Sequence, residues 1–188
     1  GPLAKMFRQC LVARPGHKLV RADLASAEAL VTGGLAGDED YMRIARLGTH
    51  KYAMACYLKV PVHLGMTDAE LKPILDTMEE RDTALYRAIK VVIYGSNYLA
   101  GPKKLYENNP EEFASQSEAA AFQKFCLNLC PKIGVWRNGV VSQRFKYRPG
   151  GWGGQGNRLI NPFGYSKEFW DLAGGDGPAA VAYLPQSI

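Results

Sequence analysis

The sequence predicts a mostly helical α+β fold with a few short antiparallel strands. Apolar residues recur at helical spacing over long stretches, most strongly at 81–98. Short runs bounded by turn residues near both ends of the chain are typical of strands. The 188 residues are 47% hydrophobic and 22% charged, which is the composition of an ordinary globular protein with one sizeable core or two small ones.

The composition also bears on partners and location. The longest apolar runs are far shorter than a bilayer requires, and no secretory signal opens the sequence, so we expect a cytoplasmic protein without a membrane partner. The net charge of +5 suits a polyanionic partner. We expect the four cysteines to be reduced, buried thiols, because no export signal is seen. Their spacing lacks the two-residue interval of zinc knuckles, so we do not expect a structural zinc site.

The first half of the chain is predicted to begin with two strands and continue as helices. Residues 9–13 and 18–23 have strand composition and are joined by a turn at 14–16. Ser26 has the side chain of an N-cap, and Gly37 is a typical helix end. The helices expected from this half are one from Ser26 to near Gly37, one over 41–59, a short one opened by Thr67-Asp68, and one over 81–98.

The second half is predicted to contain one further helix, a hairpin and the beginning of another helix. After a polar loop at 108–117, a helix at 118–130 is expected to stop at Pro131. Residues 136–148 fit either a helix or a strand, and the glycine-rich stretch 148–156 reads as a flexible connection. The remaining expectations are a hairpin at 159–169 that turns at 162–164, and a helix that begins at 179.

One face of the 81–98 helix carries cations and rings. At about 100° per residue, Arg87, Lys90, Tyr94 and Tyr98 fall within an arc of roughly 80°. The apolar residues lie on the opposite side: Leu85, Ile89, Val92 and Ile93. Such a face is either a solvated surface or a site where the cations bind phosphates and the rings stack on a sugar or base.

A second group of candidate residues lies where the predicted strand 18–23 passes into a helix. Asp23 stands at that junction, where rigid backbone on both sides can hold a carboxylate for Mg²⁺. A lone aspartate at a strand end is more often a helix cap. Glu28 follows five residues later, near enough to belong to the same site.

Taken together, these motifs resemble family A DNA polymerases, the class of bacterial DNA polymerase I and phage replicative enzymes. The strand–Asp–helix with its Glu is followed by Lys-x3-Tyr-Gly-x2-Tyr. The resemblance continues in order along nearly the whole chain, with matches at Leu35-Ala-Gly-Asp-Glu39, Gly48-Thr-His50, Asn161-Pro-Phe-Gly164 and Leu184-Pro-Gln-Ser187. It implies a right-hand fold, with a partial palm of short strands at 1–40, helical fingers at 41–135, and a return to the palm at 136–188.

The resemblance implies a role for each matching residue. Asp23 would bind two Mg²⁺ ions, and Glu28 would exclude ribonucleotides by closing the space beside the sugar. Lys90, the second residue assigned to catalysis, would hold the nucleotide phosphates together with His50 and Arg87. Tyr94 would stack on the incoming dNTP and fill the place of a missing 3′-hydroxyl, so dideoxynucleotides should be accepted. Gly95, Tyr98 and Gln186 would contact the template and primer. The implied partners are primer–template DNA, dNTPs, and the rest of the polymerase chain with its thumb and remaining palm.

The sequence departs from the family at several positions. Tyr86 stands where the family has a strong arginine, so the role of Arg87 is open, and Leu99 and Ala182 replace a usual Gly and Asn. No His-Asp-Glu tripeptide, which would bring the second metal-binding carboxylate, occurs in the 188 residues. We therefore expect that this stretch alone does not synthesise DNA. Two alternatives remain: a single-subunit RNA polymerase, which Glu28 disfavours, and a catalytically silent nucleic-acid-binding module.

Overall fold

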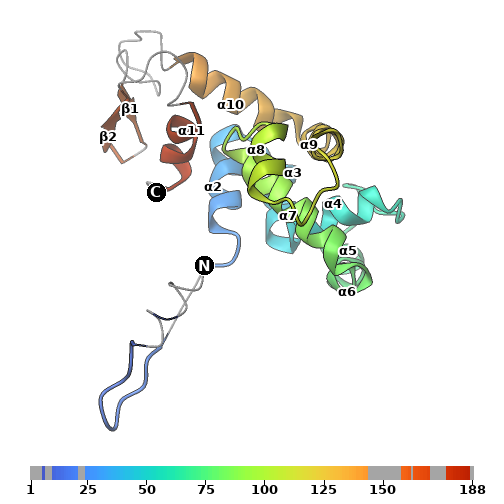
Figure 1. Ribbon diagram of the computed structural model, residues 1–188, viewed down its shortest axis with the longest axis horizontal. Coiled ribbons are helices and arrows are strands. Elements are labelled where there is room, and N and C mark those ends of the chain that lie inside the picture. Colours follow the sequence, from blue (N-terminus) through green and yellow to red (C-terminus); the bar gives the residue numbers. More distant parts are fainter. Residues whose placement is uncertain are drawn as a thin grey trace.

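The computed structural model describes residues 6, 10–20, 24–143, 158–161, 163–169 and 177–186. In these residues the protein is mostly helical, with one two-stranded antiparallel sheet, as the sequence predicts. Figure 1 shows most of the helices in one cluster, from which α10 leads to a smaller group formed by β1, β2 and α11. Asp23 and the glycine-rich stretch 148–156 lie outside the described residues.

The first helix has the predicted extent, whereas the second is divided in two. Helix α2 (Ala27–Ala36) ends at Gly37, which adopts φ 63°. Ser26 occupies the N-cap position but makes no side-chain capping bond, so that part of the prediction is wrong. The helix expected over 41–59 is two helices, α3 (Glu39–Leu47) and α4 (Thr49–Tyr57). Gly48 separates them with φ 110°, a conformation that favours glycine.

Two capped helices follow. Thr67 opens α5 (Asp68–Asp76) with a capping box that includes Glu70, which confirms the predicted beginning. After the single turn α6 (Met78–Arg81), Asp82 caps α7 (Thr83–Asn97) by accepting a hydrogen bond from the Leu85 amide at 2.9 Å. The predicted helix 81–98 is therefore confirmed apart from its ends, and Tyr98 is its C-cap.

The next three helices differ from the prediction in two respects. The short helix α8 (Pro102–Asn108) follows α7 without having been predicted. Helix α9 (Gln116–Leu129) agrees with the expectation. Pro131, however, begins α10 (Pro131–Gln143), which settles the described part of 136–148 as helix. Proline suits the first position of a helix, because an amide hydrogen at that position would have no acceptor within the helix, so its absence costs nothing.

The N-terminal strands were predicted wrongly for the residues that the structure describes. Residues 11–14 and 17–20 are extended limbs without strand pairing, and Figure 1 shows them reaching away from the helices. The turn between them is present, with the His17 amide donating to the Arg14 carbonyl at 2.9 Å. A strand is defined by its ladder to a neighbour, and the limbs have none within the described chain.

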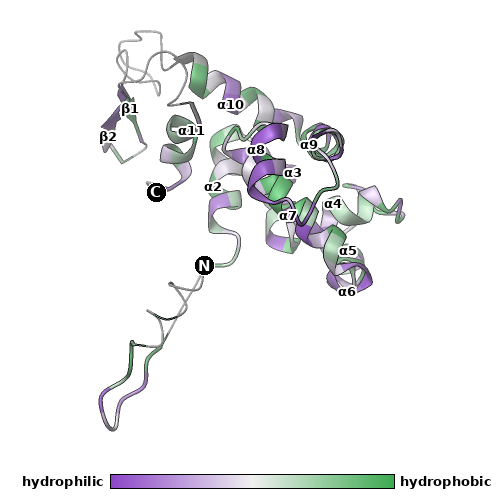
Figure 2. Ribbon diagram, in the orientation of Figure 1, coloured by the Kyte–Doolittle hydropathy of each residue, from purple (hydrophilic) through white to green (hydrophobic). Residues whose placement is uncertain are grey.

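The predicted hairpin is confirmed. Strand β1 (Arg158–Ile160) pairs antiparallel with β2 (Ser166–Glu168), so that Leu159 lies opposite Lys167. Helix α11 (Gly177–Gln186) packs beside α10 and α2. Figure 2 shows β2 in the colour of hydrophilic residues and α11 as largely apolar, which agrees with the exposure of β2.

Two apolar cores hold these elements together. The larger lies among α3 to α9 and includes Met54, Leu75, Ile89 and Val92. The smaller joins the hairpin to α10 and α11 through Leu159, Phe169, Val140, Val181 and Leu184. No helix in the described part of the chain is long and apolar enough to cross a membrane.

Gly95 allows α7 and α8 to approach closely, and this gives a test of the fold. A Cβ atom at Gly95 would overlap Cδ2 of Leu105, which is 3% exposed. We expect Gly95→Ala to lower the free energy of unfolding by about 1–3 kcal/mol through overpacking. Gly134→Ala is the matched control, because its Cβ meets nothing within 4 Å and should stabilise α10 by about 0.5–1 kcal/mol. Urea unfolding of both variants measures the difference; equal stabilities would contradict the packing.

Candidate functional site

Helix α7 separates its apolar and polar residues as predicted. Ile89 and Val92 are fully buried against the larger core. Arg87 and Lys90 are exposed, and Tyr94 keeps 39% of its surface accessible. Packing on one side therefore leaves the cations and a ring pointing away from the core.

Beside this face lies a groove between α7 and α8. Its volume is about 530 Å³, within the range of small-molecule sites. Arg87, Lys90 and Tyr94 line it from α7, and Lys104 lines it from α8. Glu111 and Glu112 line it as well. Three cations and two carboxylates leave the groove with a formal charge of +1, so its preference for an anionic ligand rests on the side where Arg87 and Lys90 stand.

His50 comes from α4 to meet the same helix. Its ring centroid lies 5.0 Å from that of Tyr94, and the ring of Tyr86 approaches edge-on at 6.0 Å. Burial, with a smaller contribution from the charge of Lys90, lowers the pKa of His50 to about 4. The Nε2 atom is buried and has no hydrogen-bond partner in the part of the chain that the structure describes. A neutral imidazole with a free nitrogen can bond a polar ligand atom.

A second group gathers around Glu28. The hydroxyl of Tyr98 donates to one carboxylate oxygen, and Nε2 of Gln186 donates to the other at 3.4 Å. These side chains come from α2, the end of α7 and α11, so residues far apart in sequence meet here. Burial, followed by the bond to Glu28, raises the pKa of the Tyr98 hydroxyl. The hydroxyl therefore stays protonated and remains a donor.

The predicted metal ligand is not among the residues brought together, since Asp23 lies outside the described part of the chain. Within that part, no cluster of three histidine, cysteine, aspartate or glutamate side chains is arranged to hold a metal ion. Glu28 is the carboxylate of the second group, and both of its oxygens already accept hydrogen bonds. The described residues therefore show no preformed Mg²⁺ site.

Sequence reasoning missed the residues that hold the end of α7. Arg137 of α10 is only 7% exposed and donates to the Ser96 carbonyl. Gln123 of α9 donates to the Ser96 hydroxyl at 2.9 Å and to the Ala100 carbonyl at 2.6 Å. The signal available in the sequence is spacing, because Arg137 shares a helix face with the buried residues Ile133 and Val140.

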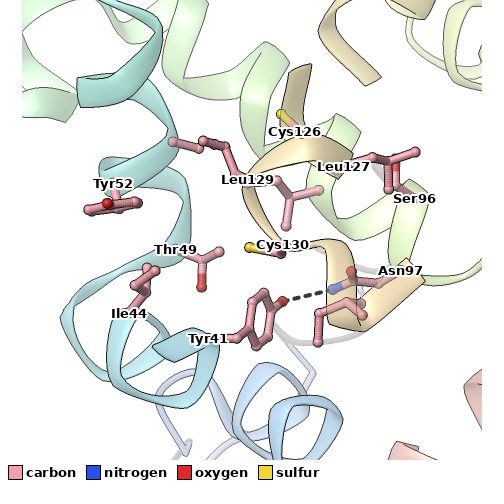
Figure 3. Close-up of a pocket in the computed structure, with 13 residues that line it drawn as sticks. Tyr41, Ile44, Thr49, Tyr52, Ser96, Asn97, Cys126, Leu127, Leu129 and Cys130 are labelled. Carbon is pink, nitrogen blue, oxygen red and sulfur yellow. Dashed lines mark hydrogen bonds between the residues drawn. The ribbon is translucent and has the colours of Figure 1, made fainter. Parts of the chain in front are cut away.

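A small apolar cavity lies on the buried side of α7. Figure 3 shows it among α3, α4, α7 and α9, with the hydrogen bond from Asn97 to Tyr41 at its edge. Its volume is about 30 Å³. Burial raises the pKa of the Cys126 and Cys130 thiols at its wall to about 12, so both stay protonated and unreactive. The expectation of buried thiols fails for Cys10, which is exposed.

No protein-family model, curated protein or solved structure matches the chain. The likeness to family A polymerases therefore stays a prediction from the sequence motifs, beside which the structure shows two side-chain groups. One group joins His50, Lys90 and Tyr94, and the other joins Glu28, Tyr98 and Gln186.

The depressed pKa of His50 predicts a pH dependence of stability. The folded protein favours the neutral ring, so this stability is complete above pH 6.5 and is lost as the pH falls toward 4. The loss amounts to at most about 3 kcal/mol. Denaturant unfolding from pH 7 to 4 should show it, and His50→Phe should remove it.

Lys90→Met separates the two causes of the shift. Because burial is the larger cause, we expect the substitution to raise the pKa of His50 only in part, as measured by an NMR titration of the ring. An unchanged pKa in this variant would show that Lys90 does not act on His50.

Proposed function

We propose that the chain is the nucleotide-binding part of a DNA polymerase of the family A type, which adds dNTPs to a primer 3′-hydroxyl under the direction of a template. The main support is the hydrogen-bonded group of Glu28, Tyr98 and Gln186, whose members belong to three separate motifs of the resemblance. His50 belongs to a fourth motif and packs on Tyr94 of the same helix.

In this proposal the cations of α7 hold the triphosphate. Lys90 and Arg87 are exposed on one face, so their charges can reach phosphate oxygens without first breaking an ion pair in the described chain. The resemblance assigns a further phosphate oxygen to His50, but its Nε2 is buried here, so the ring contributes by packing against Tyr94. Tyr94 supplies a ring for the sugar and base.

Glu28 acts as the sugar gate in this proposal. Two donors fix its carboxylate, so it forms a wall that does not move aside for an additional 2′-hydroxyl. Rejection of a ribonucleotide is then steric, which discriminates more strongly than a missing contact. The bond from Tyr98 connects Glu28 to the C-terminal end of α7, where the proposal places the template.

Asp23, five residues before Glu28, would hold Mg²⁺ in the complete enzyme, where the ions align the 3′-hydroxyl with the α-phosphate and neutralise charge on the leaving pyrophosphate. The resemblance assigns the second carboxylate to a His-Asp-Glu motif that these 188 residues do not contain. Nucleotide binding is therefore the property to test on this chain, and synthesis belongs to the complete polymerase.

Removal of the Lys90 charge tests the phosphate site. We expect Lys90→Ala to weaken dNTP binding about tenfold or more, because a hydrogen bond to a charged group contributes about 1.5–3 kcal/mol. Lys72→Ala is the matched control, since Lys72 pairs with Asp76 on the distant helix α5. Calorimetric titration of both variants with dATP measures the effect; equal affinities in the two variants would refute the assignment.

Glu28→Ala tests the gate and separates DNA from RNA synthesis. We expect the ratio of dATP affinity to ATP affinity to fall toward one, because the wall beside the 2′-hydroxyl is gone. Glu28→Gln keeps the volume of the side chain and should retain most of the discrimination. A wild-type chain that prefers ATP would instead favour the single-subunit RNA polymerase.

One observation favours a second candidate, the silent nucleic-acid-binding module. Tyr86 stands at the position of the family's strong arginine and packs edge-on against His50. The chain therefore has an uncharged ring at the position where the family has a cation for the phosphates of the nucleotide. A chain that binds DNA but shows no measurable dNTP affinity would favour the module over the polymerase.

A further inference from the structure

The turn between β1 and β2 presents two large rings to solvent. Phe163 is 66% exposed and Tyr165 is 69% exposed. The sequence motif at 161–164 contributes to the resemblance, but the proposed nucleotide site does not use these rings. Two exposed aromatic side chains two residues apart on one turn form an apolar surface of the kind that binding sites use.

Several hydrogen bonds hold the described residues of the turn. Asn161 is 4% exposed, and its Oδ1 accepts hydrogen bonds from the amides of Phe163 and Tyr165 at 3.0 and 2.9 Å. The Asn161 amide donates to the Tyr165 carbonyl at 2.8 Å, and the Tyr183 hydroxyl donates to the same carbonyl at 2.8 Å. Because these bonds fix the backbone of the two residues that carry the rings, a ligand on the rings loses little affinity to ordering them.

A cation and a hollow lie beside the turn. The Lys167 ammonium lies 5.5 Å from the ring of Phe169 and 5.9 Å from that of Tyr183, and no described carboxylate pairs with it. Lys167, Tyr183 and Gln186 line a hollow of about 430 Å³. Gln186 also bonds Glu28, so the hollow borders the group formed by Glu28, Tyr98 and Gln186.

We propose that Phe163, Tyr165 and Lys167 form a binding site for unpaired nucleotides of a nucleic-acid strand. The rings stack on bases, and the lysine faces the phosphates between them. Unpaired bases fit because the faces of paired bases are already covered by their neighbours in a duplex. The class of partner rests on the proposed function, whereas the site itself is additional to it.

Fluorescence anisotropy of the full 188-residue chain with a labelled oligothymidylate of about twelve nucleotides tests the site. We expect the double variant Phe163→Leu, Tyr165→Leu to bind about tenfold or more weakly, because leucine keeps apolar area but loses the stacking ring. Val135→Ala on α10 removes another exposed apolar side chain, 73% exposed, and should bind as the wild type does.

An abasic oligonucleotide of the same length separates stacking from charge. The wild type should bind it more weakly than oligothymidylate. The wild type and the double leucine variant should bind the abasic strand with equal affinity. Lys167→Met should reduce the salt dependence of binding, whereas the leucine substitutions should leave it unchanged. Circular dichroism and urea unfolding confirm that each variant is folded.

Three results would overturn the proposal. The first is failure of the wild type to bind oligothymidylate, and the second is binding by the double leucine variant as tight as that of the wild type. The third is that the leucine substitutions weaken binding of the abasic strand as much as binding of oligothymidylate. Self-association of the wild type that the leucine variant lacks would assign the rings to contact with a second copy. Failure of the proposed nucleotide site can be told apart from failure of this one. Lys90→Ala tests dNTP binding at α7 and leaves the rings of Phe163 and Tyr165 intact, whereas the leucine substitutions test binding of the oligonucleotide.

Discussion

Burial of the apolar face of α7 is the constraint on which the rest of the candidate site depends. Ile89 and Val92 are packed against α4 and α9 with no exposed surface. Each such side chain contributes about 1.5–3 kcal/mol through removal from water, so the helix has one preferred rotation about its axis. That rotation directs Lys90 and Tyr94 outward. The same packing brings His50 of α4 against Tyr94, and this buries the imidazole and lowers its pKa.

The two ends of α7 are held differently. Hydrogen bonds from neighbouring helices gather at its last turn, where Arg137 and Gln123 bond Ser96. Tyr98 at the C-cap is tied to Glu28 in α2. Arg87 lies in the first half of α7 and Lys90 at its middle, and the beginning of the helix is closed by its own cap at Asp82. Both halves pack against the larger core, since Ile89 in the first half and Val92 in the second are fully buried.

The sequence predicts those features that depend on local signals. The capping box at Thr67, the two faces of α7 and the hairpin turn all depend on neighbouring residues, and all three are confirmed. The predicted stop of α9 before Pro131 is confirmed, but the beginning of α10 at the same proline was not predicted. The hydrogen bond of Arg137 was not predicted, because its partner, Ser96, is 41 residues away in the sequence. The contact of Glu28 with Gln186 was not predicted, since no spacing rule connects residues 158 positions apart.

The central claim is that one triphosphate bridges Asp23 and the exposed face of α7. Paramagnetic broadening of amide NMR signals by the Mn²⁺ complex of a dNTP tests this directly, because the effect falls steeply with distance from the ion. The account predicts that the signals of Asp23, His50 and Lys90 broaden together, while those of α5 stay sharp. Broadening at α7 without broadening at Asp23, or the reverse, would contradict a shared site.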